Sequence, residues 1–412
     1  MTITTEQLVR EIHARPVRIV CAATGGGSQA IADLLRIPGG SRTILEAIIP
    51  YSSQALDSFL HATPENYCSA RTARAMAMAS FERARELVAL DLRSSTDVPR
   101  LPAELVGIGC TASLVSDRPK HGPHRIHVAV QTAAWTETAS LELTKGKRDR
   151  AGEEQLASQM VLNAIAAAGN TPSRVTSPLL GGEHVDTKRT NAPSTWQALL
   201  LGATRVVDAF AMEGDVQEGV GQVSNLSMPA GQVGNLSHGR IVFPGAFDPL
   251  HDGHRRIAEI AEQTISAPME FEISIQNVDK PPLDFTEIAA RVSQFTPPRR
   301  LWLTRAPTFV EKSRLFSHST FLAGADTIAR IADPRYYGGD AARGAAVLRE
   351  IAENGCRFLV YGRVVGDRFV TLESLCLPDE LRTLCHAIPA DVFRMDISST
   401  ELRRKGETED SL

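Results

Sequence analysis

Apolar and polar positions follow two kinds of pattern along the first part of the chain, and together these predict strands that alternate with helices. Apolar runs predict strands at 17–22, 105–110 and 125–131, and helical patterns occupy 71–91 and 151–168. The first run leads into the Gly-rich turn TGGGS and then into a segment with helical spacing. This part of the chain is therefore expected to form an α/β domain of three layers.

The same alternation returns after residue 239. A short apolar run, RIVF, precedes the turn GAFDPLHDG and a helix with Ile257, Ile260 and Ala261 on one face. Further strands are predicted at 270–276, 300–303, 319–324 and 356–362, with helices between them. Strands joined by helices indicate a parallel, doubly wound, Rossmann-like sheet.

The stretch between these two parts has a different character. It contains one helical run, from Trp196 to about Phe210, which we expect to pack on the first domain. A Gly-, Ser- and Asn-rich segment follows, in which GQVSNLS at 221–227 returns as GQVGNLS at 231–237, and this composition is typical of a flexible linker. The predicted organisation is a domain at 1–170, a connecting segment at 171–238 and a domain at 239–412.

Composition narrows the functional classes. The 412 residues are 43% hydrophobic and 22% charged, which is typical of a globular chain rather than a disordered one. A net charge of −4 argues against a broad surface for nucleic acid or anionic membranes, although a small anion site needs only a few donors. The six cysteines are scattered, and we find neither a secretion signal nor an apolar run of the roughly 18 residues needed to span a bilayer. We expect a cytoplasmic protein with small-molecule partners, and we leave a homo-oligomer open.

The segment GAFDPLHDGH, residues 245–254, contains the clearest candidate for a ligand-binding site in the sequence. In open α/β sheets, ligands lie at the carboxyl ends of strands, where the next helix offers free N–H groups and the positive end of its dipole. His251 and His254 are spaced to direct both imidazoles at one anion. Gly253 allows the backbone to approach closely, and Gly245 relieves crowding below the end of the strand. The segment therefore predicts a phosphate site.

A second anion site is predicted near the end of the chain, in DISSTELRRK at 396–405. Ser398, Ser399 and Thr400 supply hydroxyl groups at the start of a predicted helix, and Arg403 follows within about one turn. A guanidinium is suited to hold phosphate oxygens. Alone, this segment is typical of a capped surface helix; beside the first motif it indicates a phosphate contact.

The chain from about Gly239 to Lys405 resembles the nucleotidylyltransferase superfamily, whose GxFxPxHxGH and ISSTxxR motifs are both present. Within it, the chain is most similar to the nicotinamide and nicotinate mononucleotide adenylyltransferases. Weaker features carry this closer similarity: Asn277, Lys280 and Arg291 after the second strand, FLAGAD with Gly324 and Asp326, and Trp302.

The resemblance implies transfer of a nucleotidyl group from ATP, with Mg²⁺, to a mononucleotide phosphate. It implies catalytic roles for His251, His254 and Arg403 and a substrate contact for Gly324, Asp326 and Trp302. It implies ATP contacts from Gly245, Ala246, Phe247, Gly253, Lys280, Ser398, Ser399 and Thr400. Structural roles stay open for three of these residues, since Lys280 could be solvated, Asp326 a helix cap and Trp302 a core residue.

Residues 5–168 resemble the CinA carboxy-terminal domain, a family of nicotinamide mononucleotide amidases. TGG at 24–26 and IIPYSSQAL at 48–56 carry the similarity, and Tyr51 is retained. The family's catalytic Ser and Lys, however, correspond to Ala22 and Leu56. Losing a catalytic Ser costs on the order of a million-fold in turnover, so we expect a non-catalytic binding or regulatory module.

Alternatives remain at this stage. The superfamily motifs are shared by cytidylyltransferases and by enzymes that use other phosphorylated acceptors, and one sequence does not distinguish ATP from CTP. A different class would be an active amidohydrolase or a nucleotide-binding regulator, with Cys21, Thr24 or Ser28 as a substitute nucleophile.

Overall fold

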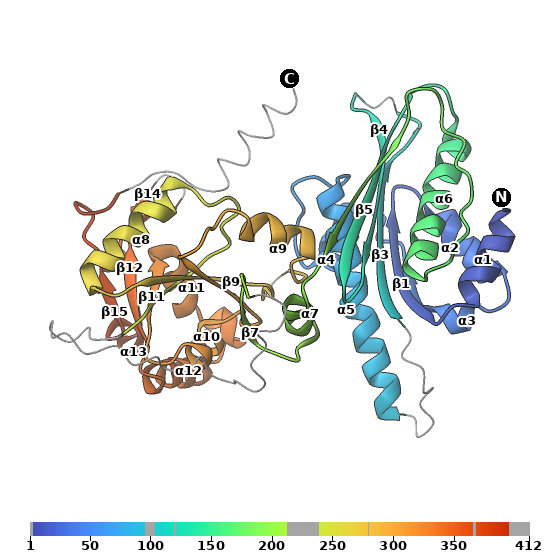
Figure 1. The fold of residues 1–412 in the computed structure, drawn as a ribbon. Coiled ribbons are helices and arrows are strands. Elements are labelled where there is room, and N and C mark those ends of the chain that lie inside the picture. Colours follow the sequence, from blue (N-terminus) through green and yellow to red (C-terminus); the bar gives the residue numbers. More distant parts are fainter. Residues whose placement is uncertain are drawn as a thin grey trace. The chain divides into compact units, whose positions relative to one another are not determined.

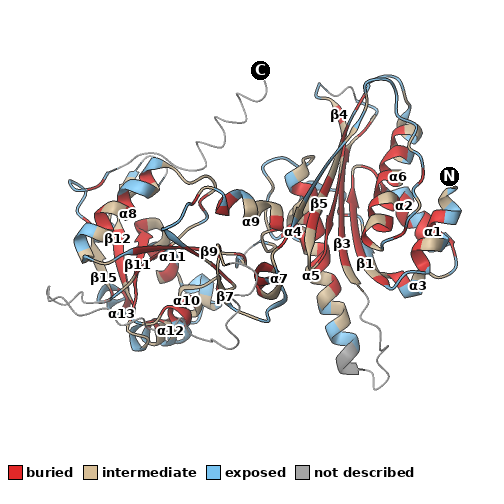
Figure 2. Ribbon diagram, in the orientation of Figure 1, coloured by how far each residue is buried: buried red, intermediate tan, exposed pale blue. Residues whose placement is uncertain are grey.

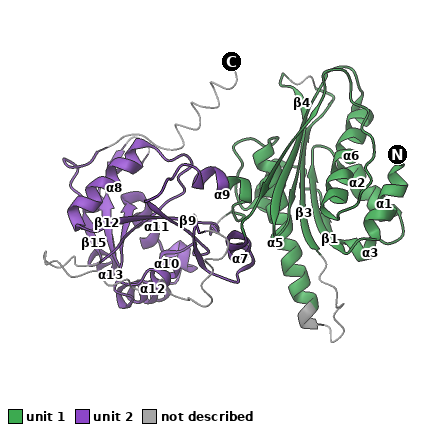
Figure 3. Cartoon of the chain, in the orientation of Figure 1, with its two compact units in different colours: residues 1–193, 279–288 green, residues 194–278, 289–412 purple. Residues whose placement is uncertain are grey.

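The computed structural model describes residues 3–94, 104–118, 121–211, 239–278, 280–365 and 368–394 (Figure 1). The chain forms two compact units (Figure 3). Unit 1 comprises residues 1–193 and 279–288, and unit 2 comprises residues 194–278 and 289–412. A short piece from the second half of the sequence is thus part of unit 1.

Unit 1 is built on a mixed sheet with the strand order β2-β1-β3-β4-β5-β6. β1 pairs in parallel with β2 and β3, and the other neighbours are antiparallel. The strands are β1 (Val17–Thr24), β2 (Ile44–Ile48), β3 (Glu104–Ser113), β4 (His124–Gln131), β5 (Trp135–Leu143) and β6 (Val185–Asn191). The strands predicted at 17–22, 105–110 and 125–131 are confirmed.

Helices cover both faces of this sheet, which confirms three layers. On one face lie α1 (Thr5–His13), α2 (Ser28–Arg36) and α6 (Arg150–Ala168), and on the other lies α5 (Ala70–Ser94) (Figure 1). Two short helices, α3 (Gly40–Thr43) and α4 (Ser53–Leu60), flank β2. α5 packs directly on β3 because Gly107 and Gly109 carry no side chain: a Cβ there would lie 2.0 Å from Ala77 O and 2.2 Å from Ala73 O.

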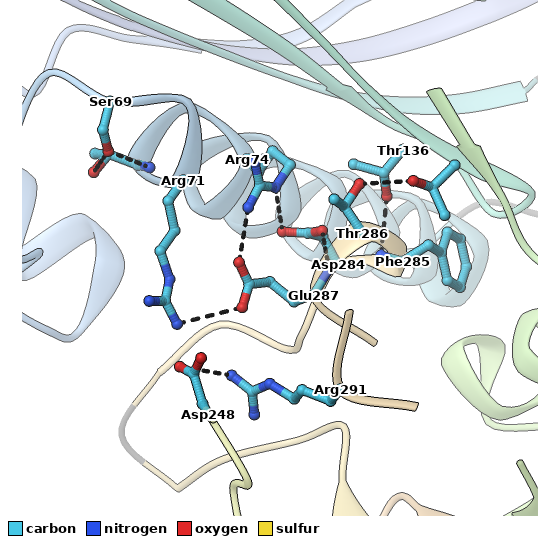
Figure 4. A network of polar contacts seen from close by, with 12 residues as sticks. Ser69, Arg71, Arg74, Thr136, Asp248, Asp284, Phe285, Thr286, Glu287 and Arg291 are labelled. Carbon is cyan, nitrogen blue, oxygen red and sulfur yellow. Dashed lines mark hydrogen bonds and ion pairs between the residues drawn. The ribbon is translucent and has the colours of Figure 1, made fainter. Parts of the chain in front are cut away.

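The piece of unit 1 that comes from the second half of the chain is held by a cluster of charges (Figure 4). Arg74 Nε lies 3.1 Å from Asp284 Oδ2, and Arg74 Nη2 lies 2.7 Å from Glu287 Oε1. Asp284 is buried, and its burial raises the pKa of its carboxyl while Arg74 opposes that change. Phe285 N–H donates to Thr136 Oγ1 at 3.1 Å. The sequence pattern did not predict this packing.

Unit 2 contains a seven-stranded sheet in the order β15-β12-β11-β8-β9-β10-β7. Six strands are parallel, namely β8 (Ile241–Pro244), β9 (Met269–Ser274), β10 (Arg300–Thr304), β11 (Thr320–Gly324), β12 (Arg357–Tyr361) and β15 (Cys385–Ala387). If these six strands are numbered 1 to 6 along the chain from β8 to β15, they lie side by side in the order 3-2-1-4-5-6, which is that of a doubly wound fold. The predicted Rossmann-like sheet is confirmed, with an added antiparallel edge strand, β7 (Val206–Asp208).

Helices connect the parallel strands, and Figure 2 shows the central strands buried between helices. The helices of unit 2 are α7 (Ser194–Leu201), α8 (Asp252–Ile265), α10 (Phe309–Leu315), α11 (Ala325–Ala332), α12 (Ala341–Glu353) and α13 (Asp379–Arg382). α9 (Phe285–Val292) is divided, since its residues up to Ile288 belong to unit 1 and the rest belong to unit 2. The smaller elements are η1 (Pro334–Tyr337), η2 (Leu372–Ser374), β13 (Arg363–Val365) and β14 (Arg368–Val370). Of the helices described, none combines the length and the apolar character needed to cross a membrane.

The segment predicted as a connection, 171–238, is divided differently in the structure. Its β6 completes the sheet of unit 1, whereas α7 and β7 belong to unit 2. The helix expected to pack on the first domain is therefore assigned to the second, because β7, which follows it, pairs with β10. The repeated heptapeptide lies outside the described residues.

Candidate functional site

The histidine-bearing loop lies where the strand order of unit 2 reverses. β8 is paired with β9 on one side and with β11 on the other. The chain leaves β8 through α8 toward β9, whereas β11 begins the other half of the sheet. In doubly wound sheets, a crevice opens at the strand ends at this reversal, and ligands bind there. The loop between β8 and α8, residues 245–251, and the start of α11 both lie at such strand ends.

His251 and His254 are brought together as expected. His251 is the N-cap of α8, and its ring stacks on that of His254 with centroids 3.8 Å apart and planes 27° apart. The backbone N–H of His251 donates to Nδ1 of His254 over 3.3 Å. A neutral His254 with Nδ1 as acceptor carries its proton on Nε2, which leaves that N–H available as a donor.

An aromatic cluster fixes the start of this loop. Phe247 has a positive φ of 46° and a buried ring, which meets Phe243, Phe271 and Phe295 edge-on at centroid distances of 5.4 to 5.5 Å. Gly245 makes room for it, because a Cβ at that position would lie 2.5 Å from the Phe247 ring. Gly245 and Phe247 therefore shape the loop through packing, and Ala246 between them is exposed.

Arg363, which sequence reasoning did not identify, adds a positive charge to the site. It follows β12 by two residues, and its Nη1 lies 3.4 Å from Asp326 Oδ2. Its positive charge also lowers the pKa of both histidines. An Arg just beyond the carboxyl end of a parallel strand was the available signal, but the sequence does not reveal that β12 and β8 are two strands apart in one sheet.

Two buried polar atoms in this region have no hydrogen-bond partner in the part of the chain that the structure describes. They are Nδ1 of His251 and Oδ1 of Asp326. Asp326 stands in the first turn of α11, whose N-cap is Gly324, and a Cβ on Gly324 would lie 2.5 Å from that same Oδ1. Buried polar atoms are ordinarily paired, so these two are open to a ligand.

The site favours neutral imidazoles in the free protein. Burial lowers the pKa of His254 to about 3, with further lowering by His251 and Arg363. Burial is also the main cause of the lowered pKa of His251, followed by Arg363. Phosphate oxygens placed beside these rings would favour their protonated form and act in the opposite direction.

We expect a ¹H–¹³C NMR titration of His254 to show no inflection near pH 6.5 in the free protein, and the inflection to move upward when a nucleoside triphosphate is bound. Between the folded pKa of about 3 and the ordinary value of 6.5, only the unfolded chain takes up the proton. The contribution of His254 to stability is therefore lost as the pH falls below about 6.5. Titration near pH 6.5 in the free protein, or no response to triphosphate, would contradict the assignment.

Some of the remaining predicted residues lie in the described part of the chain, and the others lie outside it. Gly253 is buried in the first turn of α8, whereas Lys280 is exposed and belongs to unit 1. Trp302 lies within β10, where its indole N–H donates to Glu270 over 2.7 Å and its ring packs near Phe316. These contacts account for Trp302 without a ligand. The predicted residues Ser398, Ser399, Thr400 and Arg403 lie outside the described residues.

In unit 1, the two positions where the sequence resemblance leads us to expect a catalytic Ser and Lys are apolar and lie together. Ala22 and Leu56 belong to one buried cluster with Leu60 and Met76. Burial raises the pKa of the Cys21 thiol to about 12, which opposes its use as a nucleophile. Tyr51 remains, and it is 70% exposed.

The Gly-rich turn of unit 1 is occupied by a side chain of the protein itself. Glu154 Oε2 accepts from Gly27 N–H at 3.0 Å, and Oε1 accepts from Gln29 N–H at 3.0 Å and from Ser28 Oγ at 3.2 Å. A carboxylate therefore stands where the start of α2 would otherwise attract an anion. Ser28 is engaged in this contact.

Two comparisons with known proteins gave matches to this chain. Residues 242–405 match the family model described as cytidylyltransferase-like, which supports nucleotidyl transfer in general for this part of the chain. Solved structures similar to the N-terminal part include a competence-damaged protein (CinA) superfamily protein of Escherichia coli. It is 17% identical, with a TM-score of 0.30 and coverage of 40% of this chain and 90% of that one.

A second similar structure is the competence/damage inducible protein CihA of Agrobacterium tumefaciens. It is 16% identical, with a TM-score of 0.30 and coverage of 41% of this chain and 98% of that one. No curated protein matches the sequence.

Proposed function

We propose that residues 239–412 transfer a nucleotidyl group from ATP to the 5′-phosphate of nicotinamide or nicotinate mononucleotide, giving NAD⁺ or its deamido form and pyrophosphate. The observation that carries this proposal is the pair of stacked imidazoles beside Arg363, at the point where the strand order reverses. The cytidylyltransferase-like match over residues 242–405 supports the reaction class.

In the proposed reaction, a phosphate oxygen of the acceptor attacks the α-phosphorus of the triphosphate, and pyrophosphate leaves. Such a transfer requires alignment and charge stabilisation rather than a nucleophilic side chain. His254 would donate its Nε2–H to the triphosphate, and His251 would present the open Nδ1. Arg363 and the first amides of α8 would add positive potential as charge builds up. Ser399, Thr400 and Arg403 are proposed to hold the departing phosphates.

We propose Mg²⁺ as the companion of the triphosphate. The nitrogen donors around the loop suit an anion rather than this hard cation, which prefers oxygen ligands. The histidines and Arg363 are therefore not its ligands in this proposal. When bound, Mg²⁺ would neutralise charge on the phosphate oxygens that also hold it.

For unit 1 we propose a non-catalytic module that binds a pyridine nucleotide or regulates its neighbour. The buried apolar cluster of Ala22 and Leu56 supports the loss of amidase chemistry. Both parts of the chain resemble proteins that act on pyridine mononucleotides, which favours this acceptor for unit 2. The proposed setting is the cytoplasm, with small-molecule nucleotides as partners.

A single assay tests these assignments. We expect the purified protein, given Mg²⁺, nicotinamide mononucleotide and ATP, to form NAD⁺ and pyrophosphate, resolved by chromatography. Formation of a CMP adduct with CTP would instead support a cytidylyltransferase, the second candidate, which the family match favours. Turnover only with another phosphorylated acceptor would overturn the pyridine assignment. Nicotinate mononucleotide and ammonia formed without a triphosphate would show that unit 1 is an active amidase.

A further inference from the structure

One side chain, Gln294, holds the backbone of the histidine-bearing loop at two points. Its Nε2–H₂ group donates to the carbonyl of Phe247 over 2.8 Å. Its Oε1 accepts from the N–H of Leu250 over 2.7 Å. The two held groups stand on either side of Asp248 and Pro249, and the chain enters His251 directly after Leu250. Gln294 therefore fixes both ends of the segment that precedes the stacked imidazoles.

The fit between this side chain and the loop is specific in its chemistry. Phe247 offers an acceptor and Leu250 a donor, so the partner must donate at one end and accept at the other, as a carboxamide does. A second side chain from the end of α9 reaches the same segment, since Arg291 Nη2 lies 3.5 Å from Asp248 Oδ2 (Figure 4). Gln294 is itself partly buried, in the turn that ends α9.

We propose that Gln294 is a positioning residue for nucleotidyl transfer, which acts by holding the Phe247–Leu250 segment so that His251 and His254 face the triphosphate. The proposal rests on the function proposed above for unit 2. Gln294 contacts only backbone groups of the loop and is not assigned a contact with the reacting atoms. A displacement of about 1 Å in a catalytic group can lower the rate about 100-fold. Loss of the two hydrogen bonds from Gln294 is therefore expected to affect turnover more than substrate binding.

The test compares Gln294→Ala with Ser293→Ala. Ser293 is adjacent and exposed, and its hydroxyl donates to Ala290 O of its own helix, which makes it a matched control. We expect Gln294→Ala to lower kcat about 10- to 100-fold, with KM for the nucleotides changed less than about threefold. We expect Ser293→Ala to retain kcat within about twofold of the wild type. Equal kcat values for the two variants would overturn the proposal.

Gln294→Glu gives a readout that a purely structural role would not produce, and it preserves the shape of the side chain should the alanine variant fail to fold. An ionised carboxylate accepts from Leu250 N–H but cannot donate to the Phe247 carbonyl, whereas the protonated form can. The kcat of this variant relative to the wild type should therefore rise as the pH falls from about 8 to about 5. A ratio that is constant with pH would contradict the positioning role.

Failure of the proposed function would be recognised separately, because the wild type and Ser293→Ala would then both lack transfer activity. In that case the hydrogen bonds between Gln294 and the loop are tested by amide hydrogen exchange, which needs no turnover. Leu250 N–H is expected to exchange about tenfold faster or more in Gln294→Ala than in Ser293→Ala. Unchanged exchange at Leu250 would overturn the positioning of the loop whatever the reaction is.

Discussion

Replacing His254 by alanine is expected to lower turnover about 10²–10³-fold, the effect of removing one donor that stabilises transition-state charge. The neutral ring holds its proton on Nε2 because Nδ1 accepts from His251 N–H, so alanine removes the donor that the geometry makes available. It also leaves the His251 N–H without that acceptor and the His251 ring without its stacking partner. Steady-state kinetics with ATP and nicotinamide mononucleotide measure the change.

Arg256→Ala is the matched control for this variant. Arg256 lies on the same helix, α8, and is exposed, with its guanidinium 3.2 Å from the exposed carboxylate of Glu259. Exposed pairs of this kind contribute little, so we expect activity and stability close to those of the wild type. His254→Ala with near-normal turnover, or an equal loss in both variants, would contradict the role of His254.

The second large effect is expected on stability, at a charged pair buried in unit 2. Lys312 Nζ, on α10, lies 2.7 Å from both carboxylate oxygens of Glu272 on β9, and Thr304 donates to the same carboxylate. The Glu272 side chain is 0% exposed and that of Lys312 is 6% exposed. Lys312→Met would leave the Glu272 carboxylate buried and unpaired, which costs about 3–5 kcal/mol. Denaturant unfolding of the full chain measures the change.

A double variant distinguishes two effects on the free energy of unfolding: the loss caused by one unpaired buried charge, and the net contribution of the ion pair. In Glu272→Leu with Lys312→Met, no charge remains buried, and we expect most of the stability lost in Lys312→Met to return. Arg314→Ala is the control: its partner Glu350 lies 2.5 Å away, but both side chains are more than one-third exposed, so we expect a loss of about 0–1 kcal/mol. A similar loss of stability in Lys312→Met and Arg314→Ala would show that the buried ion pair contributes no more to stability than the exposed one.

The parts of the fold that depend on local pattern could be predicted from the sequence. Several strands, such as β1 and β8, are apolar runs in the sequence, and His251 and His254 lie close together because they are three residues apart at a helix start. Ala22 and Leu56, which are apolar in the sequence, lie in one buried cluster in the structure.

The parts of the structure that depend on strand order and on long-range contacts could not be predicted from the sequence. β6, with the sequence VDTKRTN, is largely exposed and polar, so it has no strand-like alternation and was assigned to a connection. Gln294 contacts the loop from a segment more than 40 residues away, and Arg363, farther along the chain, affects His251 and His254 through its charge, so only the folded unit brings these groups together. The packing of residues 284–288 in unit 1 depends on Arg74, about 210 positions earlier in the chain.

A crystal structure with a non-hydrolysable ATP analogue and nicotinamide mononucleotide bound tests the phosphate-binding role of the histidine loop most directly. We expect the triphosphate oxygens to lie within hydrogen-bond distance of the His251 and His254 rings, with Arg363 facing the same anion. A bound analogue whose phosphates lie elsewhere, with both imidazoles turned away from them, would contradict it.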